Sequence, residues 1–428
     1  MHPALAERAR DAAELILTRL ADPAVVAEAV VASQRSSRYP FAWGGPALFT
    51  GHAGSALAFQ AAHRAFPAEA EHWRKLAHQH LVTAAHSSAA EPLTHPGISS
   101  GTAGLAFAFA DSLHEEPRYG GTLDKLNTLL AGQVNDAPSW RSVDGVRDSS
   151  YDAITGAAGT LGYLSLLTNP DHVVRQALES LIDDLVWLCA PGQGRWSIPP
   201  HLYPLETYRE KYPHGYINLG LAHGIPGPLA ALSFAHRAGY RRDGLVDAIR
   251  HTAEFLIAVD CEDAWGRNWP WGIPLTEAGD EDRGRLEPGR SAWCYGAPGV
   301  ACALLNASIA LRDNEIRDVA VDGFEATLRR VDVLPEAPLC HGVAGLLAMC
   351  VVFARETGSE AARICVDALT EQVLSHCGED LPLGVREFEG PALLDNPALL
   401  TGSAGVALAL LGATGDIGQQ WERALLIG

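Results

Sequence analysis

The chain contains few cysteines and few basic residues for its length. Its 428 residues include 8 Cys without any C-x-x-C spacing, which is too dilute for a disulfide scaffold. Lys and Arg number 32 against 51 Asp and Glu, so the net charge is −19. Nucleic acids and anionic membrane surfaces need clustered positive charge, so neither is an expected partner, whereas a cationic peptide would be attracted.

Long apolar runs and alternating strand patterns are also missing. The longest apolar runs, such as residues 346–354, are far shorter than the ~20 residues that span a bilayer. The N-terminal residues are charged early and contain no uninterrupted apolar stretch, so we expect no secretory signal. These absences predict a soluble, cytoplasmic protein without a membrane-spanning segment. Alternating runs of β-branched residues are essentially absent, which predicts a fold without a sheet.

One short phrase, Gly-x-x-Gly, recurs along the whole chain. Its third position is always Ala or Pro, and an apolar run with helical spacing follows every copy. The seven copies are Gly51–Gly54, Gly101–Gly104, Gly156–Gly159, Gly224–Gly227, Gly296–Gly299, Gly342–Gly345 and Gly402–Gly405. Their second glycines lie 46 to 72 residues apart, which is room for two helices and their loops.

Two kinds of helix are expected to alternate between these glycines. The runs that follow the glycines are apolar nearly all round, which predicts buried helices. Segments between them, such as 124–134, 173–190 and 361–376, have one apolar and one charged face, which predicts amphipathic helices. The pattern predicts an all-α, single-domain fold over residues 1–428, an α/α toroid of seven inner and seven outer helices. An open α-solenoid of the same pairs is the alternative.

If the repeats are arranged radially, the residues just before each first glycine are equivalent. The residue directly before it is Thr50, Ser100, Thr155, His223, Tyr295, His341 or Thr401. One position earlier, Cys294 and Cys340 stand where the other copies have Phe, Ser, Ile, Ala or Leu. Cys294, Cys340 and His341 are therefore a candidate Zn²⁺ set, because zinc prefers thiolate and imidazole ligands. Three ligands leave one coordination position open, as in catalytic zinc sites. A Cys–His nucleophilic pair without metal is the alternative interpretation.

Four segments resemble the signature segments of the LanC lanthionine cyclase family. They are SYDAITGAAG (150–159), NLGLAHGIPG (218–227), RSAWCYGAPG (290–299) and LCHGVAG (339–345). The resemblance covers essentially the whole chain and implies an α/α toroid with one central Zn²⁺ per chain. It implies a site composed of the zinc ligands Cys294, Cys340 and His341 and of the candidate acid–base and positioning residues Asp152, His223, Arg290 and Tyr295.

The resemblance also implies a substrate and a reaction. The substrate is a ribosomal precursor peptide that contains dehydroalanine or dehydrobutyrine, and a peptide Cys thiol adds to the alkene to form a thioether ring. Zinc binding removes the thiol proton, and the resulting enolate needs charge stabilisation and then a proton at its α-carbon. His223 is the first candidate for this acid, with Asp152 to orient it or share in proton transfer. Arg290 and Tyr295 are candidates for binding the enolate oxygen.

Three of these residues have a plainer alternative role. His223 would be a buried structural histidine, and Asp152 would be the N-cap of the third buried helix. Arg290 would form an ion pair with Asp152.

Two long connections, residues 191–216 and 262–289, precede repeats that carry the motifs. Both contain aromatic residues, so they either hold the peptide at the rim of the site or pack as simple loops. His214, in the first connection, is a weaker site candidate.

Other protein classes share parts of this pattern. A toroidal glycosidase or terpene-type cyclase would need paired carboxylates or an Asp-rich motif, and the chain contains no DDxxD. LanC-like proteins that add glutathione to dehydrated residues, and non-catalytic zinc-binding scaffolds, share the same motifs and are the remaining alternatives. The chain contains no kinase, lyase or dehydratase region, so we expect a separate dehydratase as a partner.

Overall fold

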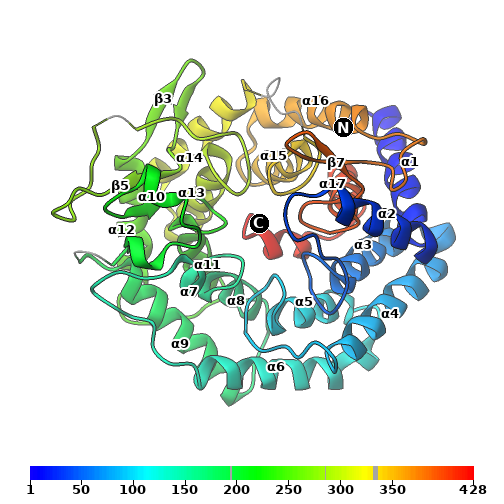
Figure 1. The fold of residues 1–428 in the computed structure, drawn as a ribbon, viewed down its shortest axis with the longest axis horizontal. Helices are drawn as coiled ribbons and strands as arrows, with labels where there is room; N and C mark the ends of the chain where they lie inside the picture. The colour runs from blue at the N-terminus through cyan, green and yellow to red at the C-terminus, as the bar shows by residue number, and fades with distance from the viewer. Residues whose placement is uncertain (193–194, 285, 331–335) are drawn as a thin grey trace. The chain divides into compact units, whose positions relative to one another are not determined.

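The computed structural model describes residues 1–192, 195–284, 286–330 and 336–428, and most of them are α-helical (Figure 1). The chain divides into two compact units. The first unit comprises residues 1–94, 99–126 and 331–422, and the second comprises residues 95–98, 127–330 and 423–428.

In the first unit, four buried helices begin at Gly-x-x-Gly copies. They are α3 (His52–Ala65), α5 (Thr102–Ser112), α15 (Val343–Thr357) and α17 (Ser403–Thr414). Helix α3 packs against α5 and α17, and α17 packs against α15. These helices are buried along nearly their whole length, as their all-round apolar sequences predict.

Amphipathic helices cover this buried row. Helix α4 packs on α3, α16 packs on α15, and α1 packs on α17. In α4 the buried residues Trp73, Ala77, Leu81 and Ala84 recur at helical spacing on one face. The bounds of the helices that cover the row or connect it are α1 (Pro3–Leu20), α2 (Pro23–Ser36), α4 (Ala70–Ser87), α6 (Gly120–Asn135) and α16 (Glu360–Ser375).

The second unit has the same arrangement around three buried helices. These are α8 (Ala157–Leu164), α11 (Pro226–Arg237) and α13 (Ala297–Leu311), and α11 packs against both of the others. They are covered in that order by α9 (His172–Cys189), α12 (Leu245–Ala258) and α14 (Asn314–Leu328). A single turn, α7 (Asp148–Tyr151), precedes α8. The described residues therefore contain a buried helix after every Gly-x-x-Gly copy, as the repeat predicted.

Short strands are present, although the sequence predicted no sheet. In the second unit, β1, β2 and β5 form a three-stranded antiparallel sheet in the order β1-β2-β5, and β3 pairs with β4. In the first unit β6 pairs with β7. Strands of two or three residues are too short to produce an alternating sequence pattern, so the sequence could not reveal them. Their bounds are β1 (Ser197–Ile198), β2 (Tyr216–Asn218), β3 (Cys261–Asp263), β4 (Gly266–Asn268), β5 (Gly272–Pro274), β6 (Glu387–Glu389) and β7 (Ala392–Leu394).

The second glycine of the repeated phrase is a point of very close backbone approach. A Cβ atom at Gly405 would lie 1.9 Å from the carbonyl oxygen of Leu399, six residues earlier. At Gly299 the corresponding distance, to the oxygen of Trp293, is 2.4 Å. No side chain fits in this space, so the loop folds tightly over the first turn of its helix. The two residues that follow this carbonyl are thereby fixed at the helix N-terminus.

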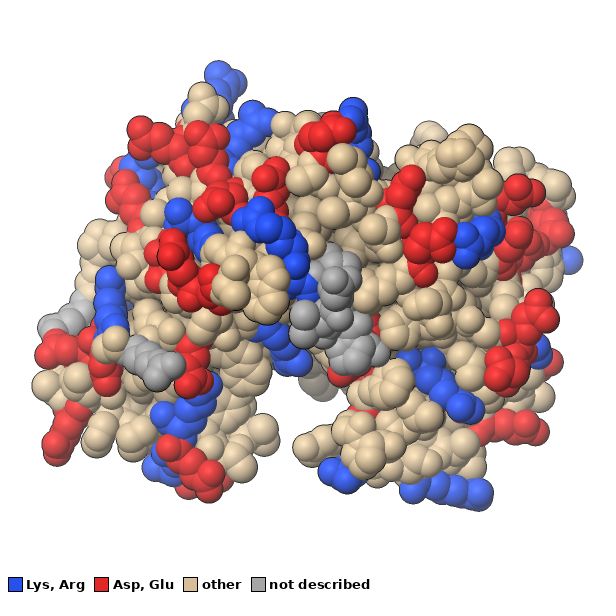
Figure 2. Space-filling view, turned by 90° about the horizontal axis from the view of Figure 1, so that it is seen from above, with Lys and Arg blue, Asp and Glu red and all other residues tan. Residues whose placement is uncertain are grey.

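Charged side chains on the surface are often paired with the opposite charge. Arg8 lies 2.6 Å from Glu371 in the first unit, and Arg141 lies 2.6 Å from Asp184 in the second. On the face drawn in Figure 2, acidic and basic side chains are interspersed. No disulfide bond joins the eight cysteines, all of which lie among the described residues. Among the residues that the structure describes, no helix combines the length and the apolar character needed to cross a bilayer.

We predict that Gly405→Ala destabilises the protein by about 1–3 kcal/mol, because the new methyl group overlaps a backbone carbonyl that cannot move away easily. Gly132→Ala in α6 is the matched control, since a Cβ atom there meets nothing within 4 Å. The control should stabilise the helix by up to about 1 kcal/mol. Urea unfolding followed by circular dichroism measures both changes, and equal stability of the two variants would contradict the close approach.

Candidate metal and acid–base site

Three loops of the second unit are joined by backbone hydrogen bonds just before their helices. The Ala153 N–H donates to the Ala222 oxygen at 3.0 Å, and the Ala222 N–H donates to the Cys294 oxygen at 3.3 Å. These bonds link the loops that precede α8, α11 and α13. As a result Asp152, His223 and Cys294 lie at one end of this unit.

Asp152 holds the His223 ring. Nδ1 of His223 donates to Oδ2 of Asp152 at 2.6 Å. The other oxygen, Oδ1, accepts the backbone N–H groups of Ile154, Thr155 and Gly156 at 3.0, 2.7 and 2.8 Å. Asp152 thus both closes the turn before α8, as an N-cap would, and orients the imidazole. The Asp152 side chain is 1% exposed and that of His223 is 40% exposed, so the ring is fixed on one side and open on the other.

Two carboxylates raise the pKa of His223. Burial by itself lowers this pKa, but the hydrogen bond that His223 donates to Asp152 and the negative charges of Asp152 and Asp148 outweigh it. Asp148 is 7% exposed, and burial raises the pKa of its own carboxyl group. The motifs do not single out Asp148. Its signal in the sequence is its spacing of one helical turn from Asp152.

Tyr295 is fixed on three sides. Its ring stacks on Trp271 with centroids 4.5 Å apart, and its hydroxyl oxygen accepts the Asn218 side-chain N–H at 3.3 Å. A Cβ atom at Gly220 would lie 2.5 Å from the Tyr295 ring, so only glycine fits beside it. Burial raises the pKa of Tyr295 well above its usual value, which keeps the phenol protonated and able to donate.

Arg290 is exposed and does not pair with Asp152. Its guanidinium carbon lies 5.7 Å from the centre of the Trp271 ring, and within the described part of the chain no carboxylate forms an ion pair with it. Arg290 therefore lies next to Trp271, which stacks on Tyr295, whereas Asp152 accepts a hydrogen bond from His223. The alternative of an Arg290–Asp152 ion pair is not what the geometry shows.

The first long connection contains a small core of its own. Tyr212 and Tyr216 stack with centroids 4.6 Å apart and, together with Ile198, form a buried cluster. These tyrosines pack as structural side chains and do not present a free surface. His214 is exposed between α10 (Tyr208–Lys211) and β2, and no described contact joins it to His223 or Tyr295.

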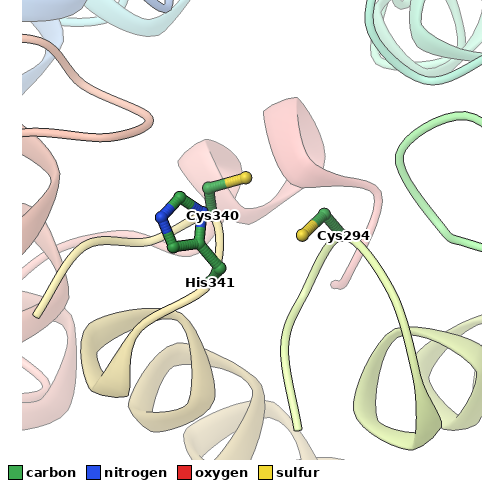
Figure 3. Close-up of side chains that lie close together, drawn as sticks. All are labelled: Cys294, Cys340 and His341. Carbon is green, nitrogen blue, oxygen red and sulfur yellow. The ribbon is translucent and has the colours of Figure 1, made fainter. Parts of the chain in front are cut away.

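In the first unit, Cys340 and His341 lie on the loop before α15 (Figure 3). The Cys340 N–H donates to the Leu400 oxygen at 3.0 Å, which ties this loop to the one before α17. Nε2 of His341 lies 2.8 Å from Oε2 of Glu336. A carboxylate on one ring nitrogen is the usual support of a metal-ligating histidine. Glu336 is a functional candidate that the motifs do not mark.

Cys294, Cys340 and His341 are a group of side chains suited to hold a metal ion. Figure 3 shows Cys294 on the loop before α13 as well as the other two residues. Zn²⁺ prefers thiolate and imidazole ligands, whereas harder cations such as Mg²⁺ and Ca²⁺ prefer oxygen ligands. Two thiols and one imidazole therefore suit zinc.

We predict that Asp152→Asn lowers the pKa of His223 in protein prepared without metal, because the substitution removes the largest contribution that favours the imidazolium. NMR titration of the His223 ring measures this pKa. Asp148→Asn should shift it in the same direction by less, and Asp144→Asn, at an exposed position on the preceding loop, should leave it unchanged.

The proton on His223 also affects the stability of the folded state. The folded state binds the His223 proton more tightly than the unfolded chain, so this proton stabilises the fold below the ordinary histidine pKa. The stabilisation disappears as the pH rises through the raised pKa. An unchanged pKa of His223 in Asp152→Asn would contradict the hydrogen bond between His223 and Asp152.

Comparisons with known proteins identify the family and support the fold. Residues 42–426 match the family model described as lanthionine synthetase C-like protein. The nisin biosynthesis protein NisC of Lactococcus lactis subsp. lactis is 27% identical over 296 residues, which cover 68% of this chain and 70% of NisC. A solved structure of nisin cyclase aligns with a TM-score of 0.78 at 23% identity, over 94% of this chain and 96% of that one.

The structural likeness shows the fold. The chain has the fold of nisin cyclase, an α/α toroid, so the predicted all-α class is confirmed. The family model covers most of the sequence, including all seven glycine copies. The chain therefore belongs to the lanthionine synthetase C-like family.

Proposed function

We propose that this protein is a zinc-dependent lanthipeptide cyclase. It would add Cys thiols of a precursor peptide to dehydroalanine or dehydrobutyrine and form lanthionine or methyllanthionine rings. The observation that carries the proposal is the His223–Asp152 hydrogen bond of 2.6 Å, in which His223 lies on a loop that is hydrogen-bonded through its backbone to the loop of Cys294. It supplies a fixed, half-exposed imidazole beside a candidate metal ligand. The family and the names of the relatives, NisC and nisin cyclase, support the same reaction class.

In this proposal Cys294, Cys340 and His341 hold one Zn²⁺ per chain. Bound there, zinc would lower the pKa of a coordinated peptide thiol and so supply a thiolate at neutral pH. The residues fit the metal, because the donor set is two thiols and an imidazole that already has a carboxylate, Glu336, on Nε2.

His223 is proposed to transfer the proton that the addition reaction requires. When the sulfur–β-carbon bond forms, the alkene electron pair moves to the carbonyl oxygen, and the α-carbon must then gain a proton. The overall reaction moves one proton from the thiol to the α-carbon, so no external acid or oxidant is consumed. Asp152 engages Nδ1 of His223, which leaves Nε2 to exchange the proton with the peptide. The hydrogen bond to Asp152 and the charge of its carboxylate favour the protonated form of His223, which a general acid needs.

Tyr295 and Arg290 are proposed to stabilise the enolate oxygen. The Tyr295 phenol stays protonated and is held by Asn218 and Trp271. It also forms a side-chain hydrogen bond with Tyr208, and as a pre-positioned donor its O–H would transfer this hydrogen bond from Tyr208 to the enolate oxygen. Arg290 is an exposed cation that no described carboxylate neutralises. A neutral donor and a cation together suit a charge that develops only during the reaction.

The partners follow from the chemistry. The substrate is a precursor peptide whose Ser or Thr side chains have been dehydrated, and a separate dehydratase would supply these alkenes. The connections 191–216 and 262–289 are proposed to hold the peptide. Each connection exposes a large apolar side chain, Leu205 at 62% and Trp265 at 43%, and these two side chains are proposed to contact the peptide.

We predict that Cys340→Ala loses most of its zinc and its cyclase activity while the fold is retained, because a core of this size does not depend on a metal. Cys377→Ala, at a partly buried cysteine of the same unit outside the motifs, is the matched control and should keep both. Metal analysis and far-ultraviolet circular dichroism measure zinc content and fold. Full zinc content in Cys340→Ala would rule out the ligand set.

We predict that His223→Asn slows ring formation by about 10²–10⁴-fold with zinc and fold retained, because it removes a general acid. Thioether formation is counted on a dehydrated precursor peptide by blocking the thiols that remain. His236→Asn, at a part-buried histidine near the end of α11, is the control and should keep the wild-type rate. Loss of zinc in His223→Asn would mean that this residue is a ligand, and a wild-type rate would remove it from the mechanism.

A further inference from the structure

Trp271 contacts both residues proposed to stabilise the enolate. Its indole ring stacks on the Tyr295 ring, with centroids 4.5 Å apart and an angle of 23° between the planes. The guanidinium carbon of Arg290 lies 5.7 Å from the Trp271 ring centre. A second cation, the Lys211 ammonium group, lies 5.3 Å from the same ring centre. One indole ring is therefore the shared neighbour of Tyr295 and Arg290.

The backbone at Trp271 is fixed by the small sheet of the second unit. Its carbonyl oxygen accepts the Leu219 N–H at 3.0 Å, and the next residue, Gly272, pairs with Asn218 in the β2–β5 ladder. Asn218 also donates its side-chain N–H to the Tyr295 hydroxyl oxygen at 3.3 Å. Two paired strands thus hold the face of the Tyr295 ring through Trp271 and its hydroxyl end through Asn218.

We propose that Trp271 is a positioning residue of the cyclisation site, which fixes the Tyr295 ring by stacking and the Arg290 guanidinium by a cation–π contact. The inference rests on the proposed function, because it assigns Trp271 to the two residues that would bind the enolate oxygen. It gives the connection 262–289 a role inside the site, besides the proposed binding of peptide.

The need for such a residue follows from the exposure of Arg290. A long exposed side chain has many rotamers, and a donor that must reorganise during the reaction stabilises charge poorly. Within the described ranges no carboxylate pairs with Arg290 to restrict it. The aromatic face of Trp271 restricts the guanidinium without neutralising its charge, which a carboxylate would do.

The test compares Trp271→Leu, which removes both contacts, with Trp271→Phe, which keeps an aromatic face. With wild-type zinc content, Trp271→Leu should lower kcat for thioether formation about tenfold and change KM less than about twofold. Trp271→Phe should restore most of kcat. In an Arg290→Ala, Tyr295→Phe background, Trp271→Leu should have little further effect, because the residues through which it acts are already removed.

Two measurements separate positioning from general damage. Trp140→Leu removes another partly buried tryptophan, which packs against the Trp187 ring and lies outside the connection 262–289. This variant should leave kcat unchanged.

In protein with labelled tyrosine, the NMR signal of Tyr295 is assigned by its loss in Tyr295→Phe. Its ring-current shift should disappear in Trp271→Leu and persist in Trp271→Phe. Trp271→Met serves as the non-aromatic variant if Trp271→Leu does not fold.

Several outcomes would overturn the proposal. These are a wild-type kcat in Trp271→Leu, equal losses in the Leu and Phe variants, or a full loss in the background that already lacks Arg290 and the Tyr295 hydroxyl. A raised KM with unchanged kcat would make Trp271 a peptide contact instead. If the wild-type protein forms no thioether, the proposed function fails, and the Tyr295 signal alone decides whether Trp271 fixes that ring.

Discussion

The structure depends on the close approach of a glycine Cα to a backbone carbonyl at the start of its buried helices. At Gly345 and Gly405 a Cβ atom would lie 1.9 Å from that oxygen, so the loop folds tightly over the helix only if no side chain is present. This constraint fixes the two residues that lie between the carbonyl and the first glycine. In two copies these residues are Cys294 with Tyr295 and Cys340 with His341. A requirement of backbone packing therefore also determines where the chemically reactive side chains stand.

Around His223 the protein combines a buried carboxylate with a half-exposed imidazole. Asp152 forms three hydrogen bonds to backbone N–H groups, which hold its charge in place although the side chain is 1% exposed. Its other oxygen, Oδ2, accepts a hydrogen bond from Nδ1 of His223 and fixes the ring. The small sheet formed by parts of the long connections supports Tyr295 in the same unit. A rigid frame with open donor and acceptor positions is the arrangement that electrostatic catalysis requires.

The sequence was sufficient to predict the helical architecture, because it depends on strong local signals. The glycine copies, the all-round apolar runs and the amphipathic segments each specify a helix and its burial. Cys294, Cys340 and His341 could be singled out because the repeat supplies an internal alignment against which two cysteines are exceptional. The strands β1 to β7 could not be predicted, because two or three residues give no periodicity.

The supporting residues of the site were equally hidden in the sequence. Glu336 and Trp271 contact His341 and Tyr295, and only the folded chain brings these residues close together. Glu336 is five residues from His341 and Trp271 is twenty-four residues from Tyr295, and neither spacing is a motif. Their contacts depend on loop conformation, which the secondary-structure propensities of the residues do not determine.

The most direct test of the central claim, that this chain forms thioether rings through a proton delivered to the α-carbon, is a reaction in D₂O. The zinc-loaded protein is incubated with a peptide that contains one dehydroalanine and one Cys, and with glutathione present in excess. The account predicts by mass spectrometry a product without a free thiol, with one deuterium at the α-carbon and no added glutathione. A glutathione adduct, or a free peptide thiol that persists at the uncatalysed rate, would contradict it.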